Sequence, residues 1–347
     1  MKTGSIDSLV NKYNPEPETV NLRSERHLLQ QQVVALKKQI GERNEIVKEI
    51  INAVVANPSA RIVQQSAKSS AVTSEVEAVL HLTDWHVGQV TVASEIEGFN
   101  VYNFAKSVAR VKSLADKVLS WVALHQHAYK VPKLRVLVTG DLISGDIHDE
   151  LKVTNEFPAP VQAVKAGYLL GDLLSTLAPQ FREVVVEFIT LDNHGRLTRK
   201  PQKSQGGFNN FSYIVGYVAK ERVSNQKNVT VTVHPYSNVI VHIPGRRYLC
   251  GHGHGIIGTF GIPYYGLQRK VGREAEARMN MSEDKHFDKI IIGHFHQPLS
   301  ALRWKIGGSL SGTDANDHSE GRHCDPCQTA WLVHPKHGEF DETTFWL

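Results

Sequence analysis

The chain has 347 residues, of which 41% are hydrophobic and 21% charged, so it can form one large α/β domain with an appendage. Its net charge of +4 permits an anionic partner but is too small to indicate nucleic acid by itself. Three cysteines form no disulfide framework, no apolar run approaches the ~20 residues that span a bilayer, and residues 1–8 lack a signal-peptide core, so we expect a cytoplasmic protein without membrane contact.

Residues 22–56 predict a helical arm. Apolar residues recur every seven positions, with a β-branched series and a companion series that is mostly leucine. The β-branched series is Val33, Ile40, Val47 and Val54. This pattern favours a parallel coiled coil and therefore a homo-oligomer, although a helix packed on its own globular domain has the same amphipathic pattern.

The arm is one of four expected parts of the chain. The sequence predicts a mobile N-terminus at 1–21, the amphipathic helix or coiled-coil arm at 22–56, a Ser-, Ala- and Gln-rich linker at 57–75, and a globular domain at 76–347.

Apolar runs and helical periodicity then predict the elements of the globular domain. The expected strands are 79–83, 134–139, 184–190, 229–234, 239–243, 248–250, 289–292, 302–306 and 330–333, and the expected helices are 104–125, 161–177 and 208–222. The first three strands alternate with helices, which predicts βαβ crossovers and an α/β fold. We assign the strands from 229 onward to a second sheet.

Polar residues of metal-binding type follow five of these strands. They are Asp84 and His86, then Asp141, then Asn193 and His194, then His252, and finally His294 and His296. Ligands bind in open α/β sheets at the carboxyl ends of the strands, so these side chains are expected to meet in one crevice. Carboxylate oxygens combined with imidazole nitrogens suit a transition metal better than calcium.

The five blocks together resemble the calcineurin-like metallophosphoesterases, whose pattern runs D-x-H, G-D, G-N-H-D/E, an isolated histidine and G-H-x-H. The resemblance covers nearly all of the globular domain. It implies a four-layer αββα sandwich and a phosphoesterase that uses two divalent ions and a hydroxide bridging them. Mn²⁺ is the expected metal, with Fe²⁺, Zn²⁺ or Mg²⁺ as alternatives.

The resemblance also implies a role for each block. Asp141 would bridge the ions and His194 would act on the leaving oxygen, so these two are the candidate catalytic residues. The full set of implied metal ligands is Asp84, His86, Asp141, Asn193, His252, His294 and His296.

Two points of this assignment stay open. His252 and His254 could exchange roles, and we favour His252 because it directly follows a strand and Gly251. The third block has Gly195 where the family has an acid that would orient His194. Either Asp192 or another acid substitutes for it, or His194 is less firmly oriented and catalysis is weak.

The substrate is suggested by the first and last blocks. L-H-L-T-D-W-H-V-G-Q and I-I-I-G-H-F-H-Q-P resemble the corresponding blocks of the SbcD-type DNA repair nucleases. The stretch after His296 is too short for the capping domain and ATPase-binding tail of that family. Such a compact form resembles phosphoesterases of bacteriophages, which would act in the host cytoplasm.

Basic residues near the third block offer candidate substrate contacts. The candidates are Arg196, Arg199, Lys200, His148 and His254, and a second wall could contain Tyr264, Tyr265, Arg269, Lys270 and Arg273. Basic side chains bind phosphates and aromatic rings stack on bases, so DNA is the expected partner. A solvated basic loop beside a buried aromatic helix, without any substrate contact, would have the same sequence pattern. The alternatives are a phosphatase, a nucleotide phosphodiesterase, or a nucleic-acid-binding scaffold with a weakly active metal site.

Overall fold

The computed structural model describes residues 26, 29–34, 37–38, 74–198, 200, 204, 206–257 and 263–347, in two compact units, Met1–Ser66 and Ala67–Leu347. In the first unit the described residues are helical, and Leu29, Val33 and Val34 are exposed. The other β-branched heptad positions, Ile40, Val47 and Val54, lie outside the described residues.

The second unit is built on a six-stranded sheet with the order β11-β10-β1-β2-β3-β4. Its strands are β1 (Glu75–Leu82), β2 (Lys130–Val138), β3 (Glu183–Ile189), β4 (Val229–His234), β10 (Cys327–His334) and β11 (Gly338–Trp346). Strands β1 to β4 are parallel, and β10 and β11 run antiparallel to their neighbours. The crossovers are the helices α3 (Phe104–His125), α5 (Ala159–Leu177) and α6 (Phe211–Arg222).

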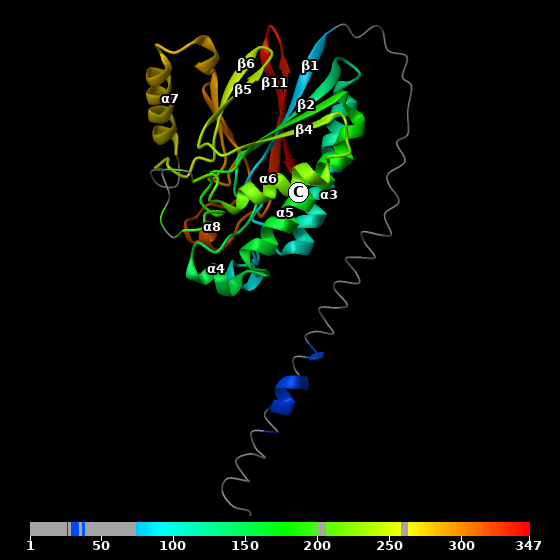
Figure 1. The fold of residues 1–347 in the computed structure, drawn as a ribbon, viewed down its shortest axis with the longest axis vertical. Helices are drawn as coiled ribbons and strands as arrows, with labels where there is room; N and C mark the ends of the chain where they lie inside the picture. The colour runs from blue at the N-terminus through cyan, green and yellow to red at the C-terminus, as the bar shows by residue number, and fades with distance from the viewer. Residues whose placement is uncertain are drawn as a thin grey trace, which may run out of the picture. The chain divides into compact units, whose positions relative to one another are not determined.

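A second sheet of five strands has the order β5-β6-β7-β9-β8. Its strands are β5 (Val239–Ile243), β6 (Arg246–Cys250), β7 (Lys289–Ile292), β8 (Leu299–Ser300) and β9 (Trp304–Ile306). The helix α7 (Tyr264–Arg278) joins β6 to β7 and buries one residue, Leu267, against the outer side of this sheet. Figure 1 shows α7 on one side of the two sheets and α3, α5 and α6 on the other.

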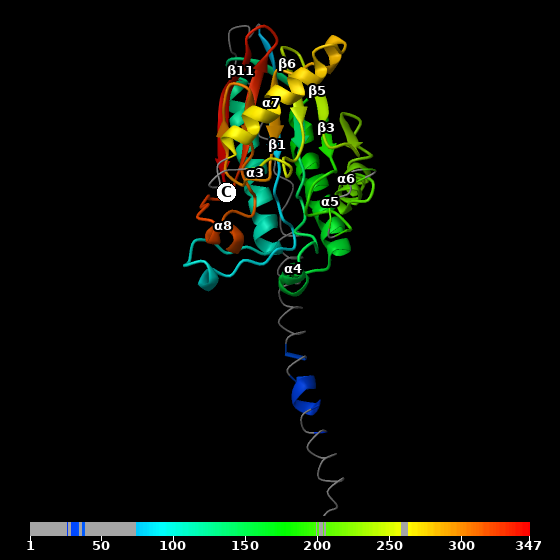
Figure 2. The same ribbon diagram turned by 90° about the vertical axis from the view of Figure 1, so that its left-hand side faces the viewer.

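Successive side chains along a strand point to opposite faces of the sheet, and this alternation produces the layers. In β1, Leu80 and Leu82 pack with α3 and α5, whereas Val79 points into the space between the sheets and packs with Tyr248 and Ile291. The order is therefore helices, sheet, sheet, helix, as Figure 1 shows, and Figure 2 looks onto the face that α7 covers. This arrangement confirms the expected α/β class and is consistent with a metallophosphoesterase-like αββα sandwich.

Two sheet assignments made from the sequence were wrong. Strand 229–234 is β4 at the edge of the first sheet, because α6 forms one more parallel crossover after β3. Strand 330–333 is part of β10, which lies beside β1 with Leu80 opposite Ala330. A short apolar strand carries no information about which sheet it joins, and this is why the assignment failed.

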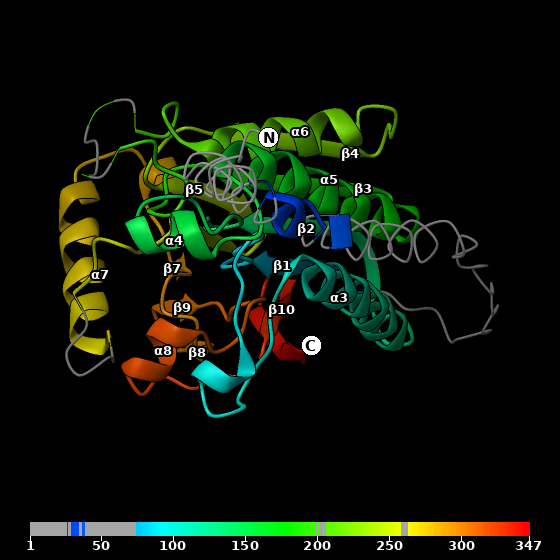
Figure 3. The ribbon, with the colours of Figure 1, turned by 90° about the horizontal axis from the view of Figure 1, so that it is seen from below.

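The remaining short helices are α4 (Asp149–Thr154), α8 (Ala315–Ser319), η1 (Ala93–Glu95), η2 (Ala178–Gln180) and η3 (Glu283–Lys285). Three of them, η1, α4 and α8, follow β1, β2 and β9. Figure 3 looks from below onto the end of the molecule where α4 and α8 lie. Among the helices that the structure describes, none is long and apolar enough to cross a membrane.

The layer between the sheets holds a buried histidine. His81 on β1 is 1% exposed and shares a 2.8 Å hydrogen bond between its Nε2 and the hydroxyl oxygen of Thr139. Burial, together with the nearby positive charge of Lys305, lowers the pKa of His81 to about 3. The ring is therefore neutral in the folded protein at any pH above that value.

We predict that His81 makes the fold sensitive to acid. The ring protonates near pH 6.5 when unfolded but only near pH 3 when folded, so its contribution to stability is complete above pH 6.5 and declines as the pH falls toward 3. Between pH 7 and pH 5 the free energy of unfolding should fall by about 2 kcal/mol more in the wild type than in His81→Gln. Urea unfolding in chelator measures this, with exposed His127→Gln as control. Equal falls in His81→Gln and the wild type would contradict it.

Candidate metal centre

The ends of β1 and β2 bring the first two blocks together. The backbone N–H of Asp84 donates to the carbonyl of Gly140 at 3.1 Å, and that of His86 donates to the carbonyl of Asp141 at 3.1 Å. Gly140 has φ of +106°, and a Cβ there would lie 2.7 Å from the Cβ of Asp192. The end of β2 can therefore lie this close to Asp192, in the loop after β3, only because this position is glycine.

The end of β7 adds the last block from the other sheet. The backbone N–H of His294 donates to Asp84 Oδ2 at 2.9 Å, and the hydroxyl of Thr83 donates to the same oxygen at 2.7 Å. These bonds fix the carboxylate of Asp84. Its other oxygen, Oδ1, is buried and has no hydrogen-bond partner.

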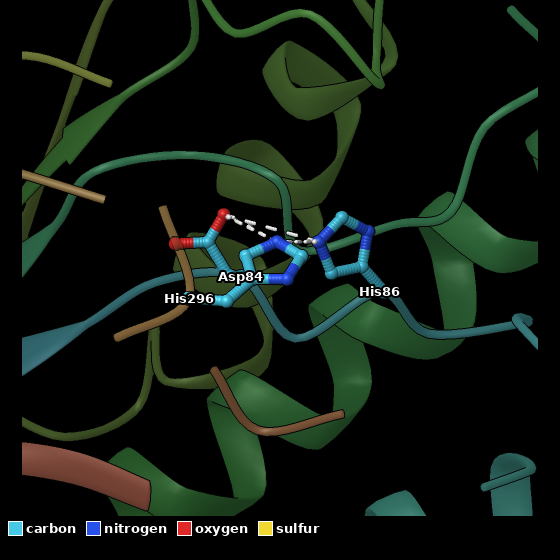
Figure 4. Close-up of side chains that lie close together, drawn as sticks. All are labelled: Asp84, His86 and His296. Carbon is cyan, nitrogen blue, oxygen red and sulfur yellow. Dashed lines mark hydrogen bonds and ion pairs between the residues drawn. The ribbon is translucent and has the colours of Figure 1, made fainter. Parts of the chain in front are cut away.

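A first group of possible ligands surrounds that oxygen. Nε2 of His296 lies 3.6 Å from Asp84 Oδ1, and Nε2 of His86 lies 3.8 Å from it. The two Nε2 atoms are 3.1 Å apart. Figure 4 shows the three side chains converging from β1 and from the loop after β7. Buried groups of this kind could hold a metal ion.

Two further groups both contain Asp141, and one of them also contains His86 from the first group. Asp141, His252 and His294 have ligand atoms within 4.8 Å of one another, as do His86, Asp141 and His194. Nε2 of His252 lies 2.8 Å from Asp141 Oδ2, and its Nδ1 contacts the carbonyl of Thr139 at 2.9 Å. Asp141 thus stands between the two clusters. His254 belongs to none of these groups.

The donor set fits divalent cations. Asn193, the remaining predicted ligand, has a buried Oδ1 without a hydrogen-bond partner, as has Asp84. Buried polar atoms are normally paired. Two unpaired oxygens beside a histidine cluster therefore indicate that these oxygens bind a partner other than a protein group. Oxygen and imidazole donors together suit Mn²⁺, Fe²⁺ or Zn²⁺.

The backbone at the candidate ligands is strained. Among the described residues, seven other than glycine have positive φ, and five of them are candidate ligands: Asp84 (53°), His86 (48°), Asp141 (50°), His294 (73°) and His296 (59°). Such conformations cost of order 1–3 kcal/mol each and persist where surrounding contacts enforce them, most often at functional sites. The strain therefore indicates a functional site at these positions, independently of the sequence motifs.

The electrostatics of the cluster favour positive charge. Burial alone would lower the pKa of His252 and of His296, but neighbouring carboxylates reverse this and raise the pKa to about 9 and about 10. Asp141 is the main cause for His252, and Asp317 for His296. By contrast, burial lowers the pKa of His294 to about 2. The carboxylates therefore attract either protons or cations, and cations bound by the same nitrogens would displace the protons.

His194 is oriented by a carbonyl group. Its Nδ1 lies 2.6 Å from the backbone oxygen of Ser144, and its Nε2 lies 3.9 Å from Asp141 Oδ2. Asp192, one possible substitute for the missing acid, is occupied elsewhere: it accepts hydrogen bonds from the backbone N–H of Asp141 and of Gly195. It holds the loop in place, and among the described residues no carboxylate forms a hydrogen bond with the ring of His194.

Sequence reasoning missed two polar residues that support the cluster. Asp317 on α8 contacts His296, with 2.6 Å between Oδ2 and Nδ1. Gln328 on β10 accepts from the backbone N–H of Thr83 at 2.9 Å and from Nε1 of Trp85 at 3.2 Å. Trp85 itself is fully buried in the core. No motif marks Asp317 or Gln328, so only the fold reveals them.

The candidate substrate contacts are less tightly grouped. Arg196 lies close enough to His254 for its charge to lower the pKa of that ring, although burial is the main cause. Lys200 is exposed, and Arg199 lies outside the described residues. His148 is exposed just before α4.

Aromatic residues lie near both proposed walls. Phe208 is 54% exposed and packs beside Tyr213, with ring centroids 5.4 Å apart. Tyr264 and Tyr265 are exposed at the start of α7. On the same helix, Arg269, Lys270 and Arg273 line a shallow pocket of about 300 Å³.

No protein-family model matches this chain, and no curated protein matches it in sequence. Among solved structures, a single mutant of Vps29 from Entamoeba histolytica is similar at 13% identity and a TM-score of 0.28, over 78% of this chain and 99% of that one. Vps29 from Chaetomium thermophilum is similar at 10% identity and a TM-score of 0.29, over 78% and 98%. Similarity this low supports no statement about the chemistry of the chain.

We predict that Gly145, which lies against the backbone of His194, must be glycine for the loop that carries His194 to take its conformation. Gly145 has φ of +67°, and a Cβ there would lie 1.8 Å from the carbonyl oxygen of His194. Gly98 has φ of +85° with open space around it. Gly98→Ala should cost about 1 kcal/mol of unfolding free energy through backbone strain alone. Gly145→Ala should cost about 3 kcal/mol, because the clash adds to the strain. Equal losses of unfolding free energy in the two variants, measured by urea unfolding, would contradict this prediction, because they would show that the loop shifts to accommodate the added methyl group.

Proposed function

We propose that this chain is a dinuclear metal-dependent phosphodiesterase, and that its substrate is DNA. The observation that carries the proposal is the convergence of strand ends from both sheets on Asp141, which belongs to two of the possible ligand groups. A single carboxylate between two clusters is the arrangement that a pair of ions requires. The order of the motifs along the sequence supports the same chemistry.

The residues divide into two ligand sets in this proposal. Asp84, His86 and His296 would hold one ion, whereas Asn193, His252 and His294 would hold the other, with Asp141 common to both. Divalent ions there would supply Lewis acidity, which neutralises charge on a phosphodiester and acidifies water. His194 would act on the leaving oxygen through its Nε2, because the contact of its Nδ1 with the Ser144 carbonyl turns Nε2 toward the cluster.

Two observations support DNA over a small phosphoester. The first and last motifs resemble those of SbcD-type nucleases rather than the superfamily pattern alone. In addition, basic and aromatic side chains occur together on the loop before α6 and on α7, as single-stranded nucleic acid requires. A phosphatase would need no such extended surface.

One observation favours a weaker enzyme. The partner of His194 is a neutral carbonyl, whereas a carboxylate would form a charge-assisted hydrogen bond of roughly twice the strength. A nucleic-acid-binding protein with slow turnover is therefore the second candidate function, and a direct assay distinguishes the two.

We predict that the purified protein binds two divalent ions per chain and that, with Mn²⁺, it cleaves bis-p-nitrophenyl phosphate and DNA. Asp141→Asn should lose metal by elemental analysis and reduce diester hydrolysis by roughly 1,000-fold, which corresponds to the several kcal/mol that metal ions supply. Asp149→Asn, an exposed acid after the same strand, is the matched control and should resemble the wild type.

The substrate panel separates the alternatives. Hydrolysis of p-nitrophenyl phosphate alone would identify a phosphatase. Retention of single- or double-stranded DNA without cleavage under any metal would identify the binding protein. A wild type that holds no metal and cleaves no ester would refute the proposal.

We also propose that residues 22–56 self-associate. Leu29 and Val33, one from each heptad series, lie four positions apart on a helix and are exposed. Val34 is also exposed but falls outside both series.

For this arm we predict that Val33→Asp lowers the molar mass measured by light scattering, because it places a charge in the seam of a coiled coil. Val34→Asp makes the same chemical change beside the seam and should leave the mass unchanged. Deletion of residues 1–60 should have the effect of Val33→Asp. A deletion variant with the oligomeric state of the full chain would exclude the arm as the contact.

A further inference from the structure

Asp317 is a described residue outside the ligand set whose carboxylate contacts the ring of a candidate ligand. It lies on α8, is 2% exposed, and places Oδ2 at 2.6 Å from Nδ1 of His296. Nε2 of the same ring faces Asp84 and His86. The carboxylate and the first ligand group therefore occupy opposite edges of one imidazole ring.

Asp317 is itself held on three sides. Its Oδ1 accepts from Nε of Arg322 at 3.2 Å, and its backbone N–H donates to Asp314 Oδ1 at 2.8 Å. The other oxygen of Asp314 accepts from Gln89 at 2.8 Å, which joins α8 to the loop after β1. A carboxylate fixed in this way can fix the ring that it contacts.

We propose that Asp317 is a positioning residue for the metal centre, an inference that rests on the proposed function. It keeps the proton of His296 on Nδ1, which leaves Nε2 as a free lone pair directed at the first ion. A ring that is bonded on its far side is held in one tautomer and one orientation, and this raises its affinity as a ligand. His296 needs such support because its backbone is strained, with φ of 59°.

The same residues do not form an ion site of their own. His296, Asp314 and Asp317 are close enough together to be considered as one. However, each of the four carboxylate oxygens already accepts a hydrogen bond, from Gln89, His296, Arg322 or the backbone of Asp317. This pairing contrasts with the unpaired oxygens of Asp84 and Asn193. It indicates that Asp317 supports His296 and does not bind an ion itself.

The test compares two substitutions of Asp317 with a neighbouring control. Asp317→Ala removes the acceptor, whereas Asp317→Asn keeps an acceptor oxygen but removes the charge. Asp325→Ala removes an exposed acid from the same segment and is the control. Calorimetric titration of the ion-free proteins with Mn²⁺ gives the two affinities, and the visible spectrum of the Co²⁺ form reports the ligand geometry. Thermal unfolding in chelator reports the fold.

Asp317→Ala should bind one of the two ions at least tenfold more weakly and alter the Co²⁺ spectrum, with the other ion unaffected. Asp317→Asn should fall between this variant and the wild type, and Asp325→Ala should match the wild type. Unchanged affinities in Asp317→Ala would overturn the inference, as would equal weakening of both ions accompanied by a lower unfolding temperature in chelator. If the wild type binds two ions, either result leaves the proposed function intact. A wild type that binds no ion refutes both.

Discussion

The whole site depends on backbone turns that proteins normally avoid. Strands β1, β2 and β7 each end in residues with left-handed conformation, and these residues carry the candidate ligands. A strand that continued straight would point successive side chains to opposite faces. The sharp turn instead sends them past the edge of the sheet into a common space. Hydrogen bonds between neighbouring strand ends, such as His86 to Asp141, hold the turns in place.

The site could be foreseen from the sequence only to the extent that it lies at strand ends. Apolar runs such as 289–292 match β7 residue for residue, and the polar residues that follow them meet as expected. Sheet membership could not be foreseen, because it is decided by pairing between distant strands such as β1 and β10. The helix α7 was missed because it buries little more than Leu267 and has no apolar stripe. Asp317 was missed since a supporting contact needs no fixed spacing from its partner.

Gly195 has a structural explanation. Gly195 lies where a Cβ would come within 2.0 Å of Asn210 Oδ1, so the loop between β3 and α6 is packed too tightly there for a side chain. In exchange, Asp192 and Asn210 tie the loop to the end of β2. His194 then takes the carbonyl of Ser144 as its partner. The carbonyl fixes the ring without adding negative charge beside it.

The position of β10 has a consequence for biosynthesis. Residues 327–334 insert between β1, formed by residues 75–82, and β11. As the ribosome makes the chain, β1 therefore waits with one open edge while some 250 residues emerge, roughly 12–50 s at ordinary elongation rates. During that interval Thr83 also lacks Gln328, whose side-chain amide accepts from the backbone N–H of Thr83 and donates to its carbonyl. The crevice at the strand ends can close only late, and until then the open edge of β1 is a site at which the nascent chain can aggregate.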